Sequence, residues 1–294
     1  MAGRKEAAFF IILSTLLSLI LPPVGLFSGA AVALITLRIS WQEGLIYTLL
    51  GSAVLAIASY LRDESLEIST GLIGWLPIVF FASFLAQTGS WQRTLQALLT
   101  VSIAGVLLFH LYEPEPALFW QATLEQFKPI LQEAYQLSST EADKLLQGMA
   151  DWMTAVFTAA IAITVALALL LARHWQAMLY NPGGFGKEFR ELSIGKIPAL
   201  VMVLCIVLAI VVGSTLAVEI LIIAIGIFML QGIAIAHSVV YQLKMGAGWL
   251  VALYVLLFVL ILVLLPQMFV LLATFGIIDN FIDFRAKIAK TDQN

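Results

Sequence analysis

Long apolar runs separated by short polar segments dominate the chain. Crossing the roughly 30 Å hydrocarbon core of a bilayer takes about 20 apolar residues in helical conformation, and reading the chain at that length predicts nine helical segments. They are Ala7–Leu21, Val24–Leu37, Gln42–Leu61, Gly71–Gln87, Trp91–Tyr112, Trp152–Arg173, Ile197–Val212, Leu216–Leu243 and Ala247–Phe275. The pattern predicts an all-α, polytopic transmembrane helical bundle, with residues 1–294 forming a single integral membrane domain.

Prolines leave the number of crossings open between eight and ten. The first two segments fall short of a full span and are divided by Pro22-Pro23. They form either a tight hairpin that does not fully cross the membrane or one broken helix. Inside a membrane, neighbouring helices or a water-filled cavity must surround such a break. Pro266 offers a second break, which would turn the last segment into a span and a short return.

Composition favours a membrane location and excludes several classes of function. The chain is 62% hydrophobic and 11% charged, whereas soluble domains are nearer half apolar and a quarter charged. The net charge is −3 and no basic cluster is present, so the sequence lacks the positive patch typical of nucleic-acid-binding proteins. The single cysteine, Cys205, cannot form an internal disulfide. No zinc-protease motif, phosphate loop or nucleophile elbow is present, so we expect no catalytic residues, no metal, no cofactor and no enzymatic activity.

Charge in the loops predicts the orientation. Residues 113–151 carry seven acidic and two basic residues, a net charge of −5, whereas the loop 174–196 is basic. Because Lys and Arg near helix ends favour the cytoplasm, the acidic segment is expected outside and the 174–196 loop and the N-terminus inside. Arg285, Lys287 and Lys290 also favour the cytoplasm, although nine crossings would leave the C-terminus outside.

The acidic segment has helical periodicity of its own. Apolar residues from Phe119 to Ala134 recur at helical spacing, which fits an interfacial helix in the lipid headgroup region or a soluble lid that packs only on the protein. Ser138 and Glu141 have capping-box spacing, which predicts a second helix that starts there and runs on through Trp152.

Small residues recur every four positions in the second segment, at Gly25, Gly29 and Ala33. Such spacing lets two helices approach closely. It fits internal packing, or a docking face for a partner subunit.

Three polar residues lie within apolar segments and are candidates for ligand binding, because polar groups at membrane depth are costly to bury. They are Glu219, Gln231 and His237. Hydrogen bonding between helices is the alternative explanation for Gln231 and His237. Six residues turn a helix by about 240° beyond a full turn, so Gln231 and His237 do not share a face, whereas His237 and Tyr241 do.

The most specific stretches are a sharp turn, Asn181-Pro182-Gly183-Gly184-Phe185, followed by Glu188 and Arg190, and a C-terminal motif with Asp279, Asp283 and Arg285. Together with Leu230-Gln231-Gly232 and His237, they resemble the YybS-like bacterial membrane proteins, a family of unknown function. That family is distantly similar to substrate-binding subunits of energy-coupling-factor transporters and to the MreD envelope proteins. The resemblance implies a multi-pass protein of the bacterial inner membrane.

Two functions are consistent with these features. The first is a substrate-binding or transport subunit energised by an ATPase supplied in trans, with a cavity open to the outer face, lined by groups such as Glu219 and Gln231, and with the acidic segment as a lid. The second is a structural scaffold of an envelope or division complex, in which the 174–196 loop and the basic tail recruit partners. In either case the partners are the lipid bilayer and other membrane subunits, and the small-molecule ligand is unknown.

Overall fold

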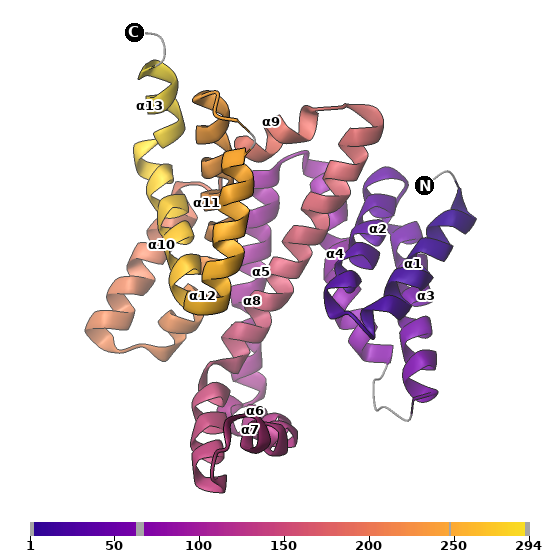
Figure 1. Ribbon diagram of the computed structural model, residues 1–294, viewed down its shortest axis with the longest axis vertical. Helices are drawn as coiled ribbons and strands as arrows, with labels where there is room; N and C mark the ends of the chain where they lie inside the picture. Colours follow the sequence, from indigo (N-terminus) through magenta and orange to yellow (C-terminus); the bar gives the residue numbers. More distant parts are fainter. Residues whose placement is uncertain (1–2, 63–67, 247, 292–294) are drawn as a thin grey trace. The chain divides into compact units, whose positions relative to one another are not determined.

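The computed structural model describes residues 3–62, 68–246 and 248–291, without the side chains of residues 68–70, 260–266 and 289–291. Over this part of the chain the regular structure is helical, with thirteen α-helices and no strand (Figure 1). Five helices are long and apolar enough to cross a membrane. They are α3 (Trp41–Tyr60), α4 (Ile68–Thr88), α5 (Trp91–Tyr112), α8 (Ser139–Tyr180) and α11 (Thr215–Gln242).

The remaining apolar helices account for the other predicted segments. They are α1 (Arg4–Ser18), α2 (Gly25–Arg38), α10 (Lys196–Val207) and α12 (Gly248–Ile282). A five-residue π-helical turn, Leu208–Val212, extends α10. Helices α6 (Pro116–Leu124), α7 (Lys128–Tyr135), α9 (Gly184–Arg190) and α13 (Phe284–Thr291) are short. The apolar helices indicate a membrane protein, and among the described residues five of them are long and apolar enough to span, compared with the nine segments predicted.

The chain divides into two compact units that interleave along the sequence. Unit 1 comprises Met1–Leu95, Ile163–Ile194 and Ala234–Tyr241. Unit 2 comprises Gln96–Ala162, Gly195–Ile233 and Gln242–Asn294.

In unit 1, α1 and α2 form a hairpin. Ala7 and Ile11 of α1 pack against Ala31, Val32 and Ile35 of α2 in one buried cluster. A short 3-10 helix, Pro22–Val24, joins the two helices, since the two prolines lack the N–H groups that would continue α1. The hairpin alternative therefore describes this part of the chain.

Small residues in unit 1 allow its helices to pack closely. A Cβ atom on Gly29 of α2 would lie 2.8 Å from the side chain of Ile78 in α4, and one on Gly51 of α3 would lie 2.9 Å from the ring of Trp75. Gly29 and Ala33 are both buried, so these two positions of the small-residue repeat take part in packing within unit 1.

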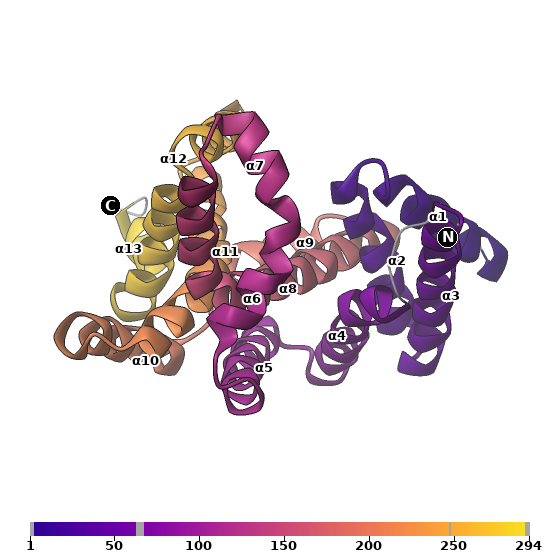
Figure 2. The ribbon, with the colours of Figure 1, turned by 90° about the horizontal axis from the view of Figure 1, so that it is seen from below.

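In unit 2, the acidic segment folds as α6, a 3-10 turn and α7 (Figure 2). The single predicted amphipathic helix is split because Pro129 opens α7 and cannot donate a hydrogen bond to the preceding turn. The Trp120 indole N–H donates to Thr154 Oγ1 of α8 at 2.8 Å, and Leu124 packs on α8 residues Leu146 and Ala150.

The predicted capping box at the start of α8 is confirmed. Ser138 Oγ accepts from the Glu141 backbone N–H at 3.3 Å, and Glu141 Oε2 accepts from the Ser138 N–H at 2.9 Å. The helix that starts at Ser139 continues through Trp152 to Tyr180, as the sequence predicted, and it is 42 residues long.

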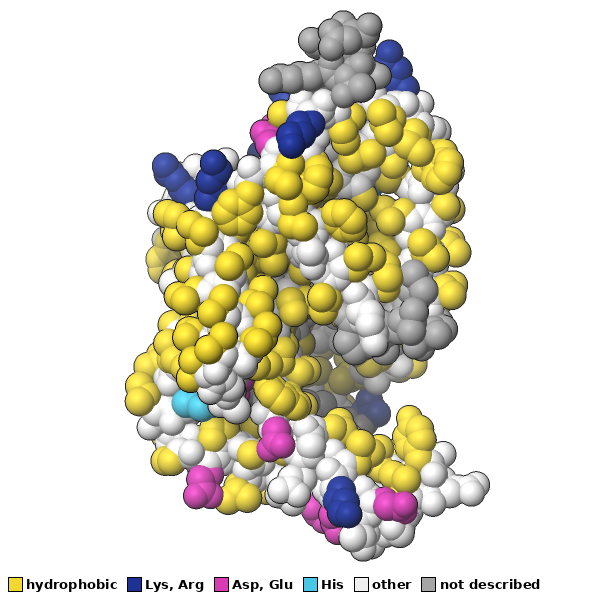
Figure 3. Space-filling view, turned by 90° about the vertical axis from the view of Figure 1, so that its left-hand side faces the viewer, with side chains coloured by type: hydrophobic (Ala, Val, Ile, Leu, Met, Phe, Trp, Pro, Cys, Tyr) yellow, Lys and Arg dark blue, Asp and Glu magenta, His cyan; other side chains and the backbone are white. Residues whose placement is uncertain are grey.

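Within unit 2, α13 lies at the end opposite α6 and α7 (Figure 1). Hydrophobic side chains cover the middle of the face seen in Figure 3, Lys and Arg gather toward its upper end, and most Asp and Glu lie toward its lower end. Within unit 2 the basic tail therefore lies away from the acidic segment. The proposed break at Pro266 falls among residues 260–266, outside the described side chains.

Candidate functional site

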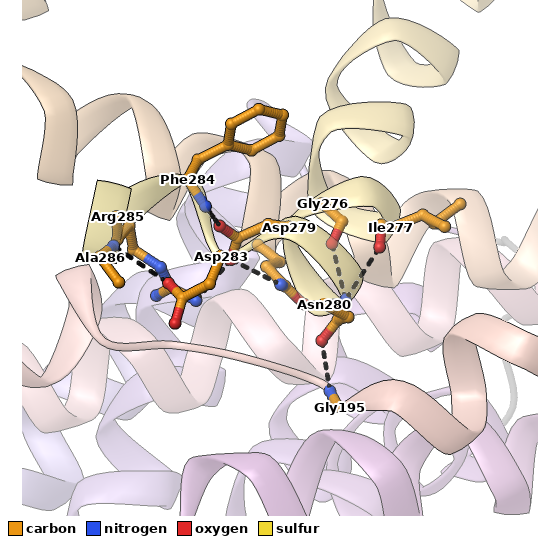
Figure 4. Close-up of polar contacts among 10 residues, drawn as sticks. Gly195, Gly276, Ile277, Asp279, Asn280, Asp283, Phe284, Arg285 and Ala286 are labelled. Carbon is orange, nitrogen blue, oxygen red and sulfur yellow. Dashed lines mark hydrogen bonds and ion pairs between the residues drawn. The ribbon is translucent and has the colours of Figure 1, made fainter. Parts of the chain in front are cut away.

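A buried polar network joins three distant parts of unit 2 (Figure 4). Gln231 of α11 is fully buried, and the Asp279 side chain at the end of α12 is 1% exposed. Asp279 Oδ2 accepts from Gln231 Nε2 at 3.3 Å and from Arg285 Nη2 of α13 at 2.6 Å. The structure thus brings the ligand candidate Gln231 together with the C-terminal motif.

Asn280 extends this network to α10. Its Nδ2 group donates to Gln231 Oε1 at 3.3 Å and to the Gly276 carbonyl at 2.7 Å, while its Oδ1 atom accepts from the Gly195 backbone N–H at 2.9 Å. Gly195 immediately precedes α10, so one side chain links the start of α10, the middle of α11 and the end of α12.

Two glycines allow α11 and α12 to come close enough for this network. A Cβ atom on Gly232 would overlap the Leu272 carbonyl oxygen, and one on Gly276 would overlap that of Phe228. Only glycine permits such a close backbone approach, and it places Gln231 beside Asp279 and Asn280.

Asp279 and Asp283 also shape the turn from α12 into α13. The Asp279 Oδ1 atom accepts from the Phe284 backbone N–H at 3.0 Å, and Asp283 has a left-handed conformation with φ of 53°. Asp283 Oδ1 then accepts from the Ala286 N–H at 3.1 Å and caps α13. The polar groups of the C-terminal motif are paired with each other and with the backbone, so this arrangement holds helices together.

Glu219 has a different partner. It lies one turn inside α11, is 5% exposed, and places Oε2 3.4 Å from Nε2 of His110 near the end of α5. The other ring nitrogen of His110 lies 3.1 Å from the Val106 carbonyl oxygen. Sequence reasoning missed His110, although both residues fall at the predicted outer ends of their helices.

His237 lies in unit 1 and contacts the loop that contains the turn motif. Its ring meets Phe189 edge-on at 5.2 Å, Phe189 stacks on Phe185 at 5.9 Å, and Phe185 contacts the ring of His174 at 5.3 Å. The Arg190 guanidinium lies 3.8 Å from the centre of the Tyr241 ring, one helical turn beyond His237. The loop is therefore packed onto α8 and α11 through the side chains that distinguish it.

The turn itself has clear local causes. Gly183 has a φ of 85°, which favours glycine, and a Cβ atom on Gly184 would collide with the Asn181 amide. Glu188 then accepts two hydrogen bonds from Arg173, both at 3.0 Å, and one from Trp91 Nε1 at 3.4 Å. The turn and this ion pair fix α9 against α5 and α8.

The three predicted ligand residues have different partners. Glu219 contacts His110, Gln231 belongs to the C-terminal network, and His237 packs on Phe189. Within the described part of the chain, no three His, Cys, Asp or Glu side chains are grouped to hold a metal ion.

A cavity lies elsewhere, in unit 1. It has a volume of about 370 Å³ and lies beside the proline interruption between α1 and α2. Its wall includes Ser18, Pro22, Gly25, Gly74 and Trp75, with contributions from α3 and α8. Sequence reasoning identified the interruption and the glycine repeat, but it did not place a cavity there.

Comparison with known proteins adds no relative, because no protein-family model, curated protein or solved structure matches the chain.

Proposed function

We propose that this chain is a YybS-like, multi-pass protein of the bacterial inner membrane with a cytoplasmic N-terminus, and that it captures a small ligand for a transport system energised by an ATPase in trans. The observation that carries the proposal is the cavity of about 370 Å³ in unit 1. Small-molecule sites have volumes of about 300–1,000 Å³, so the cavity is large enough for a compact ligand.

The position of the cavity supports a binding role. It adjoins Pro22 and Pro23, where the backbone leaves the α-helical conformation. Non-helical backbone at membrane depth is tolerated where protein buries it or where it lines a cavity. The turn of the α1–α2 hairpin lines this cavity, which is consistent with a binding role.

The wall indicates the chemistry of the ligand. Of the residues that line the cavity none is ionisable, and Ser18, Thr164 and Trp75 are those with polar side-chain groups. Ser18 donates its hydroxyl hydrogen to the Thr15 carbonyl at 2.6 Å, which leaves its oxygen able to accept. A neutral, compact molecule with an apolar body fits this wall.

Filling the cavity tests the proposal. A Cβ atom on Gly74 meets no atom within 4 Å, so Gly74→Leu would enter the open space without a backbone clash. Gly105→Leu is the matched control, since Gly105 also has open space around it and does not line the cavity. Purified full-length protein would be screened for thermal stabilisation by small neutral molecules.

A ligand at one hundred times its Kd stabilises the folded state by about 2.7 kcal/mol. We expect that stabilisation to disappear in Gly74→Leu and to persist in Gly105→Leu. Equal stabilisation of both variants would place the ligand outside the cavity and refute this site.

Copurification from the native membrane tests the transport assignment separately. Recovery of an ATPase with a coupling membrane subunit would support it, whereas recovery of envelope-assembly proteins without an ATPase would support the scaffold function. For the scaffold, Phe185 and Arg190 are poor test positions, because both already contact side chains of this chain. The exposed Lys187 and Glu191 of the same loop are better ones.

A further inference from the structure

A second cleft lies at the end of the α1–α2 hairpin where the chain begins. It has a volume of about 270 Å³ and is bounded by the start of α1, the end of α2 and the start of α3. Arg4, Arg38 and Tyr47 contribute its polar groups, and residues such as Leu34 and Ile39 form its apolar wall. We call this space the arginine cleft. It is distinct from the cavity beside Pro22.

The charges around the arginine cleft favour an anion. Arg4 forms an ion pair with Glu43 and accepts a hydrogen bond from Tyr47 on its backbone carbonyl at 3.1 Å. Arg38 has no carboxylate partner among the described residues; its guanidinium lies 4.5 Å from the centre of the Tyr180 ring. An exposed guanidinium with hydrogen-bond donors at its edges matches the geometry of a phosphate group.

The backbone adds positive potential to the same space. Gly3 is the N-cap of α1 and provides no side chain to the first N–H groups of the helix, and it also lines the cleft. The N-terminal end of a helix carries a partial positive charge that favours anions. Glu6, in the first turn of α1, and Glu43, paired with Arg4, oppose part of this potential, so Arg38 remains the main attraction.

The surroundings suit a lipid. Ile39 and Trp41, at the junction of α2 and α3, are exposed large apolar residues, and a tryptophan at a helix end is typical of the membrane interface. An apolar wall next to two arginines would receive acyl chain and headgroup together. Basic pockets between membrane helices commonly bind anionic headgroups.

We propose that the arginine cleft binds the phosphate group of an anionic phospholipid, with Arg38 as its principal contact and Arg4 as its second. This inference does not depend on the ligand-capture function. Phosphate is also available as a free ion, and the test separates the two sources.

The test measures the affinity of detergent-solubilised full-length protein for phosphatidylglycerol and phosphatidylcholine by native mass spectrometry. A basic residue near a membrane surface contributes about 1 kcal/mol, which is about fivefold in affinity. We expect Arg38→Gln to weaken phosphatidylglycerol binding about fivefold. Arg4→Gln with Arg38→Gln should weaken it between about fivefold and thirtyfold, because Arg4 is already paired with Glu43. Arg93→Gln, an exposed arginine outside the cleft, should leave it unchanged.

A conservative variant and a competing ligand complete the experiment. Arg38→Lys keeps the charge and should fold normally, with an affinity between those of the wild type and Arg38→Gln. If millimolar inorganic phosphate displaces phosphatidylglycerol from the wild type and stabilises it thermally, the cleft binds phosphate from either source; if it does neither, the site is specific for the lipid. Equal affinity for phosphatidylglycerol and phosphatidylcholine, or an equal loss in Arg93→Gln and Arg38→Gln, would overturn the proposal.

Discussion

Replacing Asp279 by asparagine isolates the charge at the centre of the C-terminal network. The shape of the side chain is kept, and Oδ1 can still accept from the Phe284 backbone N–H. The new amide nitrogen, however, would face two donors, Gln231 Nε2 and Arg285 Nη2, where Oδ2 accepts from both. Asp279→Asn therefore removes an ion pair and places donors against each other in a buried site.

The magnitude follows from burial. Breaking a buried ion pair by changing one partner costs about 3–5 kcal/mol. The Arg285 side chain is 17% exposed and that of Asp279 is 1% exposed, so water offsets a small part of the loss at Arg285. We expect the free energy of unfolding to fall by about 3 kcal/mol.

The matched control is Asp283→Asn, four residues along the chain. Asparagine caps a helix as well as aspartate does and tolerates the left-handed conformation found at Asp283. The same chemical change should cost less than about 0.5 kcal/mol there, as for exposed positions generally.

The assay is reversible unfolding of the full-length protein in mixed micelles of increasing SDS content, read by far-ultraviolet circular dichroism. A double-mutant cycle with Arg285→Met should give a coupling energy of about 1.5–3 kcal/mol, the range for hydrogen bonds to charged groups. If Asp279→Asn and Asp283→Asn lower stability equally, the buried network does not hold α12 and α13 in the way described.

Two further predictions use the same preparation. Gly276→Ala should lower the free energy of unfolding by about 1–3 kcal/mol, because its Cβ would overlap the Phe228 carbonyl oxygen. Gly105→Ala, in open space, should not lower it. Equal effects of the two substitutions would contradict the close crossing of α11 and α12. A hydrogen bond from Lys128 to Asp143 raises the pKa of Lys128 above its ordinary value of 10.5. The stabilisation of the folded state by this pair is therefore fully present below pH 10.5 and is lost only as the pH rises through the raised pKa. Thermal midpoints of wild type and Lys128→Met should run parallel between about pH 6 and pH 9, and a divergence in that range would refute the assignment.

The helices were predictable because their signal is local. Apolar length identified α5 with the bounds that the structure gives, and the Ser138–Glu141 capping box identified the start of α8. Pro22-Pro23 showed where the first two segments separate, but not whether they fold back on each other. Whether they form a hairpin depends on the packing of Ala7 and Ile11 against α2. This is a tertiary contact, which the local hydropathy of the sequence does not predict.

The polar contacts were predictable only in part. Gln231, Asp279 and Arg285 could each be singled out, yet their meeting depends on the close crossing that Gly232 and Gly276 permit between distant segments. The pairing of His110 with Glu219 could have been predicted, because both lie at the same predicted end of their helices. The cavity beside Pro22 was not predictable, because its wall is mostly apolar and lacks the ionisable residues that mark a candidate site in an apolar segment.

The residues that carry the family resemblance have structural explanations in this chain. Gly183 provides the left-handed turn, Glu188 fixes α9 through Arg173, and Asp279 holds α12 to α13. Because these groups are already paired within the protein, using them to bind a ligand would first require breaking contacts that stabilise the fold. The walls of the two clefts are less constrained: Gly74 faces open space, and Arg38 has no carboxylate partner among the described residues, although Arg4 is paired with Glu43. If the proposed functions hold, ligand selectivity is therefore expected to depend on the cleft walls rather than on these paired groups.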